Sequence, residues 1–221
     1  MCGRFALTQP NDAMARLFAA APANDLPTPP EYNICPTHRV HTVTTAPEGR
    51  RLGGMRWGFI PHWYTAPGDG PLLINARAET IARKPAFRSA CRERRCLIPA
   101  SGFYEWTKDA DGRRLPWYIT SADDSLLAFA GVYQEWGQGE DRLTTCAIVT
   151  CAANAPMQRL HHRMPVILAQ GDWPLWLGEA GHGAATLMRP APDEALTFWR
   201  VDPDVNSNRA SGAGLISPIS G

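Results

Sequence analysis

The four residues that begin the chain, Met1-Cys2-Gly3-Arg4, carry its most distinctive chemistry. Because the side chain of Cys2 is small, we expect a methionyl aminopeptidase to remove Met1 and leave Cys2 with a free amine beside its thiol. The ordinary pKa is about 7.7–8.0 for such an amine and about 8.5 for a thiol, so both groups are close to their reactive forms at neutral pH. This aminothiol condenses with an aldehyde to an imine, and the thiolate then closes a thiazolidine ring. The alternative is that Cys2 is only a small apolar residue at the start of a strand.

A glutamate lies among aromatic residues in the strand-like segment Gly102-Phe103-Tyr104-Glu105-Trp106. Because the side chains of a strand alternate between its faces, Glu105 is predicted to share a face with Phe103. Tyr104 and Trp106 then share the opposite face. A carboxyl group among aromatic rings is expected to have a raised pKa, which suits a general acid or base near neutral pH. A carboxylate on a solvated strand face is the alternative.

The segment Asn75-Ala76-Arg77-Ala78-Glu79 follows a short apolar stretch. The amide of Asn75 could orient a nucleophile, and the guanidinium of Arg77 could hold a phosphate through two hydrogen bonds. The alternative is that Asn75 caps a helix.

Two histidines and an arginine stand together in Leu160-His161-His162-Arg163-Met164-Pro165, at a turn before a strand. An imidazole at this place could shuttle a proton, and two ordinary surface histidines are the alternative. Adjacent residues in a turn are poorly placed to bind one metal ion together.

Positive charge gathers between residues 77 and 95, where only Glu79 and Glu93 are acidic. The basic residues are Arg77, Arg83, Lys84, Arg88, Arg92, Arg94 and Arg95. This strip could bind phosphates, and Trp63, Tyr64 and Trp106 could stack against bases. Arg4 could add a phosphate contact beside the reactive terminus. A solvated helix face is the alternative explanation of such a run.

The six cysteines do not indicate a metal site. Cys91 and Cys96, like Cys146 and Cys151, are separated by four residues, whereas structural zinc ligands usually have a tighter spacing across a turn. We expect buried thiols, no disulfides, no metal and no cofactor.

Composition indicates one globular domain over residues 1–221, with a flexible polar tail from about residue 206. The net charge of +1 excludes a globally basic nucleic-acid binder, so a site for polyanions must be local. There is no apolar run near 18 residues and no leader-like segment, which predicts a cytoplasmic protein without a membrane span. We expect a monomer.

Short predicted elements alternate along the chain. A capped helix is predicted over 13–18, an irregular loop over 21–36, a hairpin of strands over 40–45 and 52–59, a long loop over 61–70, and a helix over 79–91 that Pro85 bends or restarts. Strands follow over 95–98, 102–107, 116–120, 126–135, 143–150, 164–168 and 196–201, with helical turns at 157–160 and 173–177. This order predicts an α+β fold with a mostly antiparallel, barrel-like sheet and short peripheral helices.

Taken together, the four motifs around Cys2, Asn75, Glu105 and His161 resemble the SOS response-associated peptidase (SRAP) family, which senses abasic sites in single-stranded DNA. The segments 32–37, 57–61 and 205–206 also resemble this family, so the resemblance covers nearly the whole chain. It implies a barrel-like α+β fold and a covalent bond between Cys2 and the ring-opened sugar aldehyde of an abasic site, which shields the lesion from strand cleavage.

The resemblance also implies roles for individual residues. Cys2 would be the nucleophile, Asn75 the orienting amide, Glu105 the acid and base, and His161 the residue that assists ring opening and reversal. His161 is chosen over His162 because it follows an aliphatic residue and precedes an x-Arg-x-Pro segment. The implied DNA contacts are Arg4, Arg77 and Trp106, with Trp63 and Tyr64 added.

Two other functions remain open from the sequence. The Cys2 thiol could cleave the peptide bond before it, although with Met1 alone upstream ordinary methionine removal suffices. The protein could also be a non-covalent single-stranded DNA-binding module with an inert Cys2.

Overall fold

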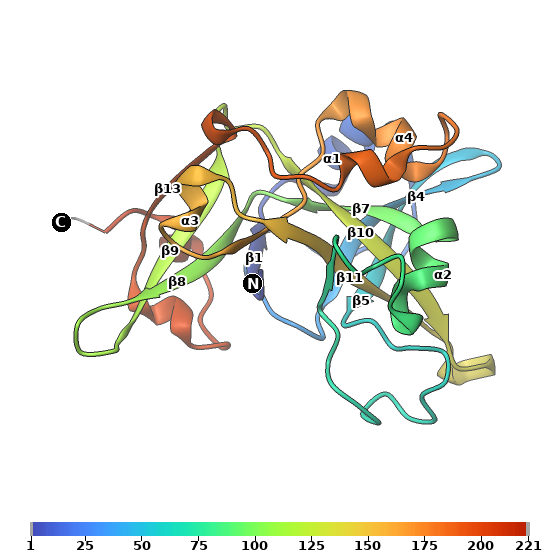
Figure 1. Cartoon of the computed structure of the whole chain (residues 1–221), viewed down its shortest axis with the longest axis horizontal. Coiled ribbons are helices and arrows are strands. Elements are labelled where there is room, and N and C mark those ends of the chain that lie inside the picture. The colour runs from blue at the N-terminus through green and yellow to red at the C-terminus, as the bar shows by residue number, and fades with distance from the viewer. Residues whose placement is uncertain (1, 220–221) are drawn as a thin grey trace.

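The computed structural model describes residues 2–219, which form two β-sheets that meet near the N-terminal strand (Figure 1). Short helices lie mainly around the larger sheet. The predicted α+β class, with a mostly antiparallel and barrel-like sheet, is confirmed.

The larger sheet has eight strands, and most of it closes into a ring. β11 and β5 pair in parallel through Thr145 with Arg56 and Cys146 with Trp57, which joins the two ends of the run β11-β10-β7-β4-β5. β6 also pairs with β11. The strands are β2 (Ala20–Pro22), β4 (Arg39–Ala46), β5 (Gly49–Trp57), β6 (Asn75–Arg77), β7 (Arg95–Ala100), β10 (Leu127–Trp136), β11 (Leu143–Ala152) and β12 (Arg163–Pro165).

The predicted hairpin is formed by β4 and β5, whose register runs from Arg39 opposite Arg56 to Ala46 opposite Gly49. β4 is rich in Val and Thr, which favour a pleated strand. Gly49 has a φ of 116°, a backbone conformation open to glycine but strained for other residues, and this allows the tight reversal.

The smaller sheet has the strand order β13-β9-β8-β1-β3 and is entirely antiparallel. Its strands are β1 (Phe5–Leu7), β3 (Glu31–Ile34), β8 (Gly102–Lys108), β9 (Arg114–Ser121) and β13 (Leu196–Arg200). β1 therefore lies inside this sheet, between β8 and β3. β7 of the larger sheet continues almost directly into β8, so the chain crosses from one sheet to the other at Ser101.

The helices are short. They are α1 (Asn11–Phe18), α2 (Pro85–Glu93), α3 (Ala155–Gln158) and α4 (Trp173–Leu177), with 3-10 turns at Gly139–Asp141, Gln170–Asp172, Ala184–Leu187, Asp193–Ala195, Pro203–Asn206 and Ala213–Ile216. The predicted helix over 79–91 begins only at Pro85, because proline fits the first helical position, and hydrogen-bonded turns occupy the residues before it. The predicted irregular loop over 21–36 contains β2 and β3.

Two hydrophobic clusters form the core. In the main cluster, the ring centroid of Phe5 lies 5.1 Å from that of Trp57, and Phe103 packs nearby. The second cluster contains Tyr104, with Trp106 packed against it. The two faces predicted for the strand around Glu105 are therefore confirmed.

The segment after residue 206 differs from the flexible tail that its polar composition predicts. Up to residue 219 it packs against the smaller sheet, where Leu215 is buried in the second cluster. The carbonyl oxygens of Ser207 and Ala210 accept hydrogen bonds from the Asn33 side chain. A few buried contacts thus hold a segment whose composition is typical of coil.

None of the helices within residues 2–219 has the length and apolar character needed to cross a bilayer. The expected monomeric state and cytoplasmic location stay predictions.

A buried histidine makes the stability of this fold depend on pH. His41 of β4 is 3% exposed, and its Nε2 lies 2.7 Å from Oδ1 of Asn11 in α1. Burial lowers the pKa of His41 from 6.5 to about 4. Between these values the unfolded chain binds a proton that the folded protein excludes, so stability is full above pH 6.5 and falls as the pH drops toward 4.

We predict that this histidine removes about 3 kcal/mol from the free energy of unfolding between pH 6.5 and pH 4. The His41→Gln variant should be less stable at pH 7 but should lose less stability over this range, as measured by urea unfolding. His182→Gln, at an exposed position, serves as the control. Equal losses in His41→Gln and the parent protein would contradict the prediction.

Candidate functional site

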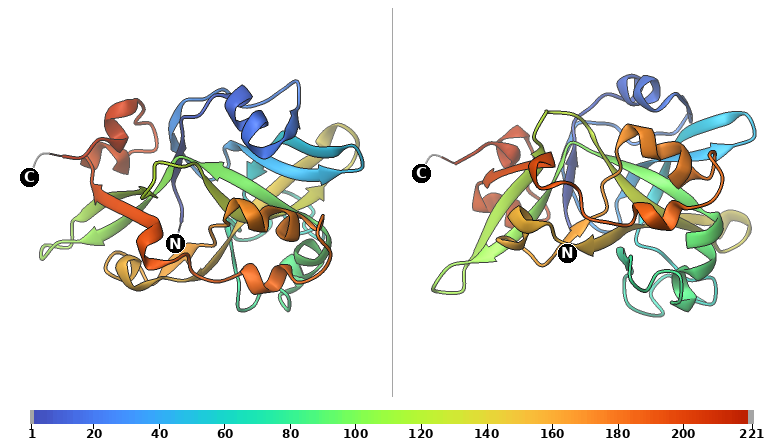
Figure 2. Two further views of the ribbon diagram at one scale, coloured as in Figure 1. Left: turned by 90° about the horizontal axis from the view of Figure 1, so that it is seen from above. Right: turned by 45° about the horizontal axis from the view of Figure 1, so that its top comes forward.

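Cys2 is fully buried at the start of the chain segment that becomes β1. The backbone N–H of Tyr104 donates to the carbonyl oxygen of Arg4 at 2.9 Å, and Phe5 pairs with Phe103, so this segment is tied to β8. Figure 2 shows the blue N-terminal segment approaching the orange α3–β12 segment in both views. Cys2 is thus enclosed between parts of the molecule that are distant in sequence.

The Cys2 thiol shares this buried region with the carboxyl group of Glu105, which is 3% exposed. Burial raises the pKa of the Cys2 thiol, and the nearby charge of Glu105 raises it further, while the backbone N–H of Arg4 acts in the opposite direction. The thiol is therefore protonated at neutral pH. A reaction at its sulfur would need a base that takes the proton, and Glu105 is the acidic residue whose charge acts on this thiol.

The Asn75 side chain holds the backbone of Cys2. Its Nδ2 donates a hydrogen bond to the carbonyl oxygen of Cys2 at 2.9 Å. Its Oδ1 is buried and has no hydrogen-bond partner within residues 2–219. Asn75 begins β6, where it pairs with Ile148 of β11, so its backbone is fixed. A buried carbonyl oxygen without a partner can accept a hydrogen bond from a group that forms or binds at this site.

His161 lies in the turn between α3 and β12, and Arg163 fixes its ring. Nδ1 of His161 accepts a hydrogen bond from the Arg163 backbone N–H at 2.9 Å. The guanidinium of Arg163 forms two hydrogen bonds with the carboxylate of Glu79, at 2.6 and 2.9 Å, and one with the carbonyl oxygen of Thr150 at 2.7 Å. This pairing lowers the pKa of Glu79.

The Arg163–Glu79 ion pair connects two motifs that the sequence presents separately. Both are also attached to β11, since β6 pairs with residues 148–150 and β12 with residues 150–152. Asn75 and the His161 turn therefore lie at the same end of β11. The sequence shows that an arginine and a glutamate accompany these motifs, but it does not show that they pair.

Arg4 is 9% exposed, and its guanidinium is held by three protein acceptors. It donates to Oδ1 of Asn33 at 2.6 Å, to the carbonyl oxygen of Val205 at 3.0 Å and to Oδ1 of Asn208. Its Nε is buried and has no hydrogen-bond partner in the described part of the chain. A phosphate contact by Arg4 stays a prediction, and Nε is the atom that could make it. Nothing in the sequence indicates the role of Asn208, which lies in the segment expected to be a tail.

Two guanidinium groups and a hydrogen bond at its nitrogen hold the Trp106 ring. Nε1 donates to Oδ1 of Asn206 at 2.6 Å. The guanidinium carbons of Arg4 and Arg114 lie 5.8 Å and 4.6 Å from the ring centroid. Arg114, at the start of β9, was not among the predicted site residues. Trp106 is thus held in place beside Arg4 of the N-terminal segment.

The other three residues predicted to contact DNA, Arg77, Trp63 and Tyr64, are less buried than Cys2. Arg77 is exposed, and Trp63 is 48% exposed on the long loop before β6. Tyr64 is half-buried, and its carbonyl oxygen accepts a hydrogen bond from Trp136. Their contact with DNA stays a prediction.

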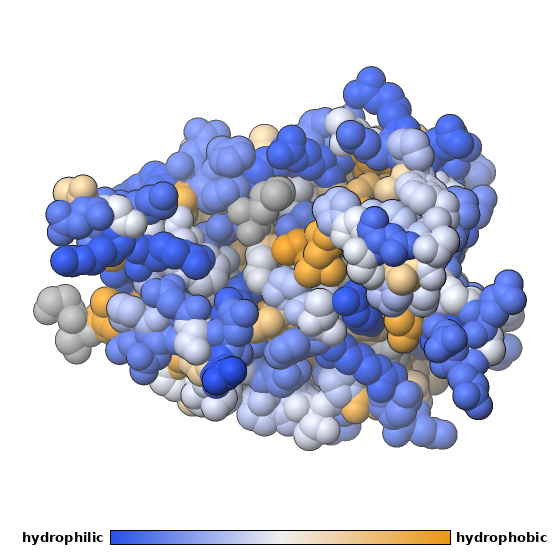
Figure 3. All heavy atoms as spheres, turned by 90° about the horizontal axis from the view of Figure 1, so that it is seen from below, coloured by the Kyte–Doolittle hydropathy of each residue, from blue (hydrophilic) through white to orange (hydrophobic). Residues whose placement is uncertain are grey.

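The arginine strip divides into two parts. Arg77, Arg83, Lys84, Arg88 and Arg92 are exposed, but Arg94 and Arg95 are half-buried. The Arg95 guanidinium donates to the carbonyl oxygens of Cys91, Arg92 and Trp176, which attaches α2 to α4. Seen from below, the molecular surface is largely hydrophilic, with hydrophobic side chains in small separate groups (Figure 3).

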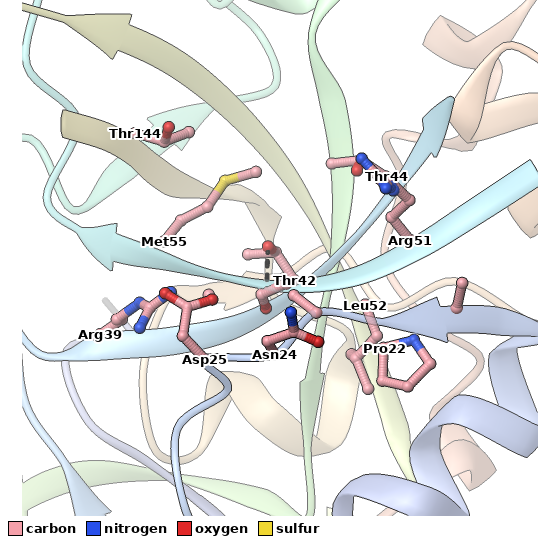
Figure 4. Close-up of a pocket in the computed structure, with 14 residues that line it drawn as sticks. Pro22, Asn24, Asp25, Arg39, Thr42, Thr44, Arg51, Leu52, Met55 and Thr144 are labelled. Carbon is pink, nitrogen blue, oxygen red and sulfur yellow. Dashed lines mark hydrogen bonds and ion pairs between the residues drawn. The ribbon is translucent and has the colours of Figure 1, made fainter. Parts of the chain in front are cut away.

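Within residues 2–219, no three His, Cys, Asp or Glu side chains are grouped so that they could bind a metal ion. A cavity of about 480 Å³ lies over β2, β4 and β5, with the Arg39–Asp25 ion pair at one end and Arg51 at the other (Figure 4). None of the predicted site residues lines it. The candidate site is therefore the enclosed region around Cys2.

The chain is similar to known proteins over nearly its whole length. The family model described as SOS response associated peptidase (SRAP) matches residues 1–208. The chain is 35% identical over 223 residues to the abasic site processing protein YoqW of Bacillus subtilis, covering 98% of this chain and 99% of that protein. It is 30% identical over 227 residues to the abasic site processing protein YedK of Escherichia coli, covering 99% and 100%.

Solved structures share the fold. A Bacteroides thetaiotaomicron protein superposes with a TM-score of 0.86 at 23% identity, covering 99% of this chain and all of that one. A phage-related protein of Bordetella bronchiseptica superposes with a TM-score of 0.70 at 30% identity, covering 90% and 94%. With the family model matching nearly its whole length, the chain belongs to the SOS response-associated peptidase family.

Proposed function

We propose that this protein processes abasic sites in single-stranded DNA, and that Cys2, once Met1 is removed, forms a thiazolidine with the ring-opened sugar. The observation that carries the proposal is the enclosure of Cys2 between the Asn75 amide and the Glu105 carboxyl group. The names of the relatives, abasic site processing proteins, support the choice of substrate.

Removal of Met1 is a chemical requirement of this proposal. The nitrogen of Cys2 in a peptide bond with Met1 is an amide, which is not a nucleophile. As a free amine it can attack the aldehyde carbon, and its N–H groups can donate to the buried Oδ1 of Asn75. The hydrogen bond from Nδ2 of Asn75 to the Cys2 carbonyl oxygen would hold the residue during this attack.

The reaction proceeds through ring opening, iminium formation and ring closure, each with a proton transfer. His161 protonates the sugar ring oxygen while the C1′ hydroxyl loses its proton to water, which opens the ring and exposes the aldehyde. The neutral amine adds to the aldehyde carbon, a proton passes from nitrogen to oxygen to give a carbinolamine, and Glu105 donates the proton with which water leaves, giving an iminium ion. The Glu105 carboxylate then accepts the thiol proton as sulfur bonds to the iminium carbon, and the electron pair of the carbon–nitrogen double bond returns to nitrogen. The adduct contains the protein and the DNA minus one water molecule.

A base that accepts the thiol proton is needed because the Cys2 pKa is raised by burial. An exposed thiol would ionise by itself near pH 8.5, but this one would remain protonated. The same burial would keep water from the imine before the ring closes.

DNA binding is proposed for the exposed surface around this region. Arg77 would bind backbone phosphates, together with the exposed arginines that follow it in the chain. Trp63, Tyr64 and Trp106 would contact bases beside the missing one. Nε of Arg4 would reach a phosphate next to the reacting sugar.

We predict that Cys2→Ala abolishes the stable adduct. Its free amine can still form an imine, which hydrolyses unless borohydride reduces it, but there is no sulfur to close the ring. The measurement is a denaturing gel of untagged protein with single-stranded DNA that carries one abasic site. A slow-migrating band at full yield in Cys2→Ala without reductant would contradict the thiazolidine, and no band in the parent protein would contradict the proposed function.

Glu105→Gln should slow adduct formation by about 10²- to 10⁴-fold, because glutamine can neither donate nor accept the required protons. Binding to intact single-stranded DNA, measured by fluorescence anisotropy, should not change. Glu140→Gln, at an exposed position in a turn, is the matched control. An unchanged adduct rate in Glu105→Gln, with folding confirmed by thermal unfolding, would remove Glu105 from the mechanism.

A further inference from the structure

His162 stacks directly on His161 in the turn before β12. The two imidazole centroids are 4.3 Å apart, and the ring planes are inclined by 29°. His162 is exposed, whereas His161 is half-buried. One ring of the stack is therefore open to solvent and the other is partly enclosed.

The backbone of Arg163 can hold the His161 ring in either protonation state. Nδ1 of His161 lies 2.9 Å from the Arg163 N–H and 3.2 Å from the Arg163 carbonyl oxygen. An unprotonated Nδ1 accepts from the N–H, and a protonated Nδ1 donates to the carbonyl oxygen. The ring can thus gain or lose a proton without leaving the turn.

The charged groups near the stack oppose a second proton. The nearby His161, Arg163 and Arg77 side chains all lower the pKa of His162, and His161 has the largest effect. Glu79 is the acidic side chain next to them, and its carboxylate is paired with Arg163. Because the two rings are so close, a proton on either imidazole opposes a proton on the other.

We propose that the side chain at position 162 sets the pH range in which His161 takes up and gives back its proton, so that His162 is a positioning residue for the proton transfer assigned to His161. The catalytic part of this inference rests on the proposed function. A charge this close to an imidazole favours or disfavours its protonated form. Position 162 is exposed, and a unit charge about 4 Å away that is screened as in bulk water moves the pH midpoint by about 0.7 unit.

The test compares His162→Lys, His162→Gln and His162→Glu. All three lose the ring stack, so differences among them report the charge at position 162. The alkaline limb of the adduct-formation rate, where the acid loses its proton, should move to lower pH in the lysine variant and to higher pH in the glutamate variant, with the glutamine variant between them. Each displacement should be about 0.5 to 1 pH unit.

The same charge changes at His182, an exposed histidine outside the site, are the matched controls and should leave the profile unchanged. Identical alkaline limbs in His162→Lys and His162→Glu, or displacements in the reverse order, would overturn the proposal. Equal displacements from the His182 variants would also overturn it, because net charge alone would then explain the effect.

A second measurement separates this proposal from the proposed function. The His161 ring proton resonance is titrated by NMR in the protein without DNA, in the lysine and glutamate variants at position 162. The midpoint should be lower with lysine than with glutamate, even if no adduct forms with abasic DNA. Coincident midpoints would overturn the role of position 162, whereas a missing adduct with separated midpoints would count against the proposed function alone.

Discussion

The site depends on the burial and fixation of a chain terminus, the part of a protein that is usually least ordered. Two features oppose fraying at Cys2. β1 is an interior strand of its sheet, paired with β8 on one side and β3 on the other, so backbone hydrogen bonds begin almost at Cys2. Asn75 then holds the carbonyl group of Cys2 itself.

The side chain of Arg4 extends this constraint to the other end of the chain. Its guanidinium joins Asn33 of β3 to Val205 and Asn208, some two hundred residues away. A buried guanidinium is costly unless its donors are satisfied, and the three acceptors here bind both of its terminal nitrogens, while the buried Nε has no hydrogen-bond partner within residues 2–219. The C-terminal segment is thus part of the support of the N-terminal one, which explains why a polar segment is packed.

Burial has a chemical consequence as well as a structural one. A thiol that is removed from water and placed near a carboxylate resists ionisation, so it does not react as a free thiolate would. In the proposed reaction the thiol depends on a nearby proton acceptor, and the carboxyl group of Glu105, which raises the thiol pKa, is proposed to accept the proton. Because the thiol would lose its proton only as the new bond forms, Cys2 would react only when an aldehyde occupies the site.

Much of the fold could be predicted from the sequence, because short strands with β-branched residues and regular alternation carry local signals. The two faces of β8, the β4–β5 hairpin and the break at Pro85 are examples. The Arg163–Glu79 pair, the stacking of Arg114 on Trp106 and the packing of Leu215 could not be predicted, since each depends on contacts between distant segments. The structural role of Arg95 could not be predicted either, because a run of arginines has the same composition whether its side chains face solvent or join two helices.

The central claim, a ring that contains both the nitrogen and the sulfur of Cys2, can be tested directly on the adduct. Single-stranded DNA with ¹³C at C1′ of one abasic site is allowed to react, and the adduct is examined by intact-mass spectrometry and carbon NMR. The account predicts the mass of the protein without Met1 plus the DNA minus one water, and a tetrahedral C1′ bonded to nitrogen and sulfur. An adduct that retains Met1, or a C1′ that remains an imine or is bonded to sulfur alone, would contradict it.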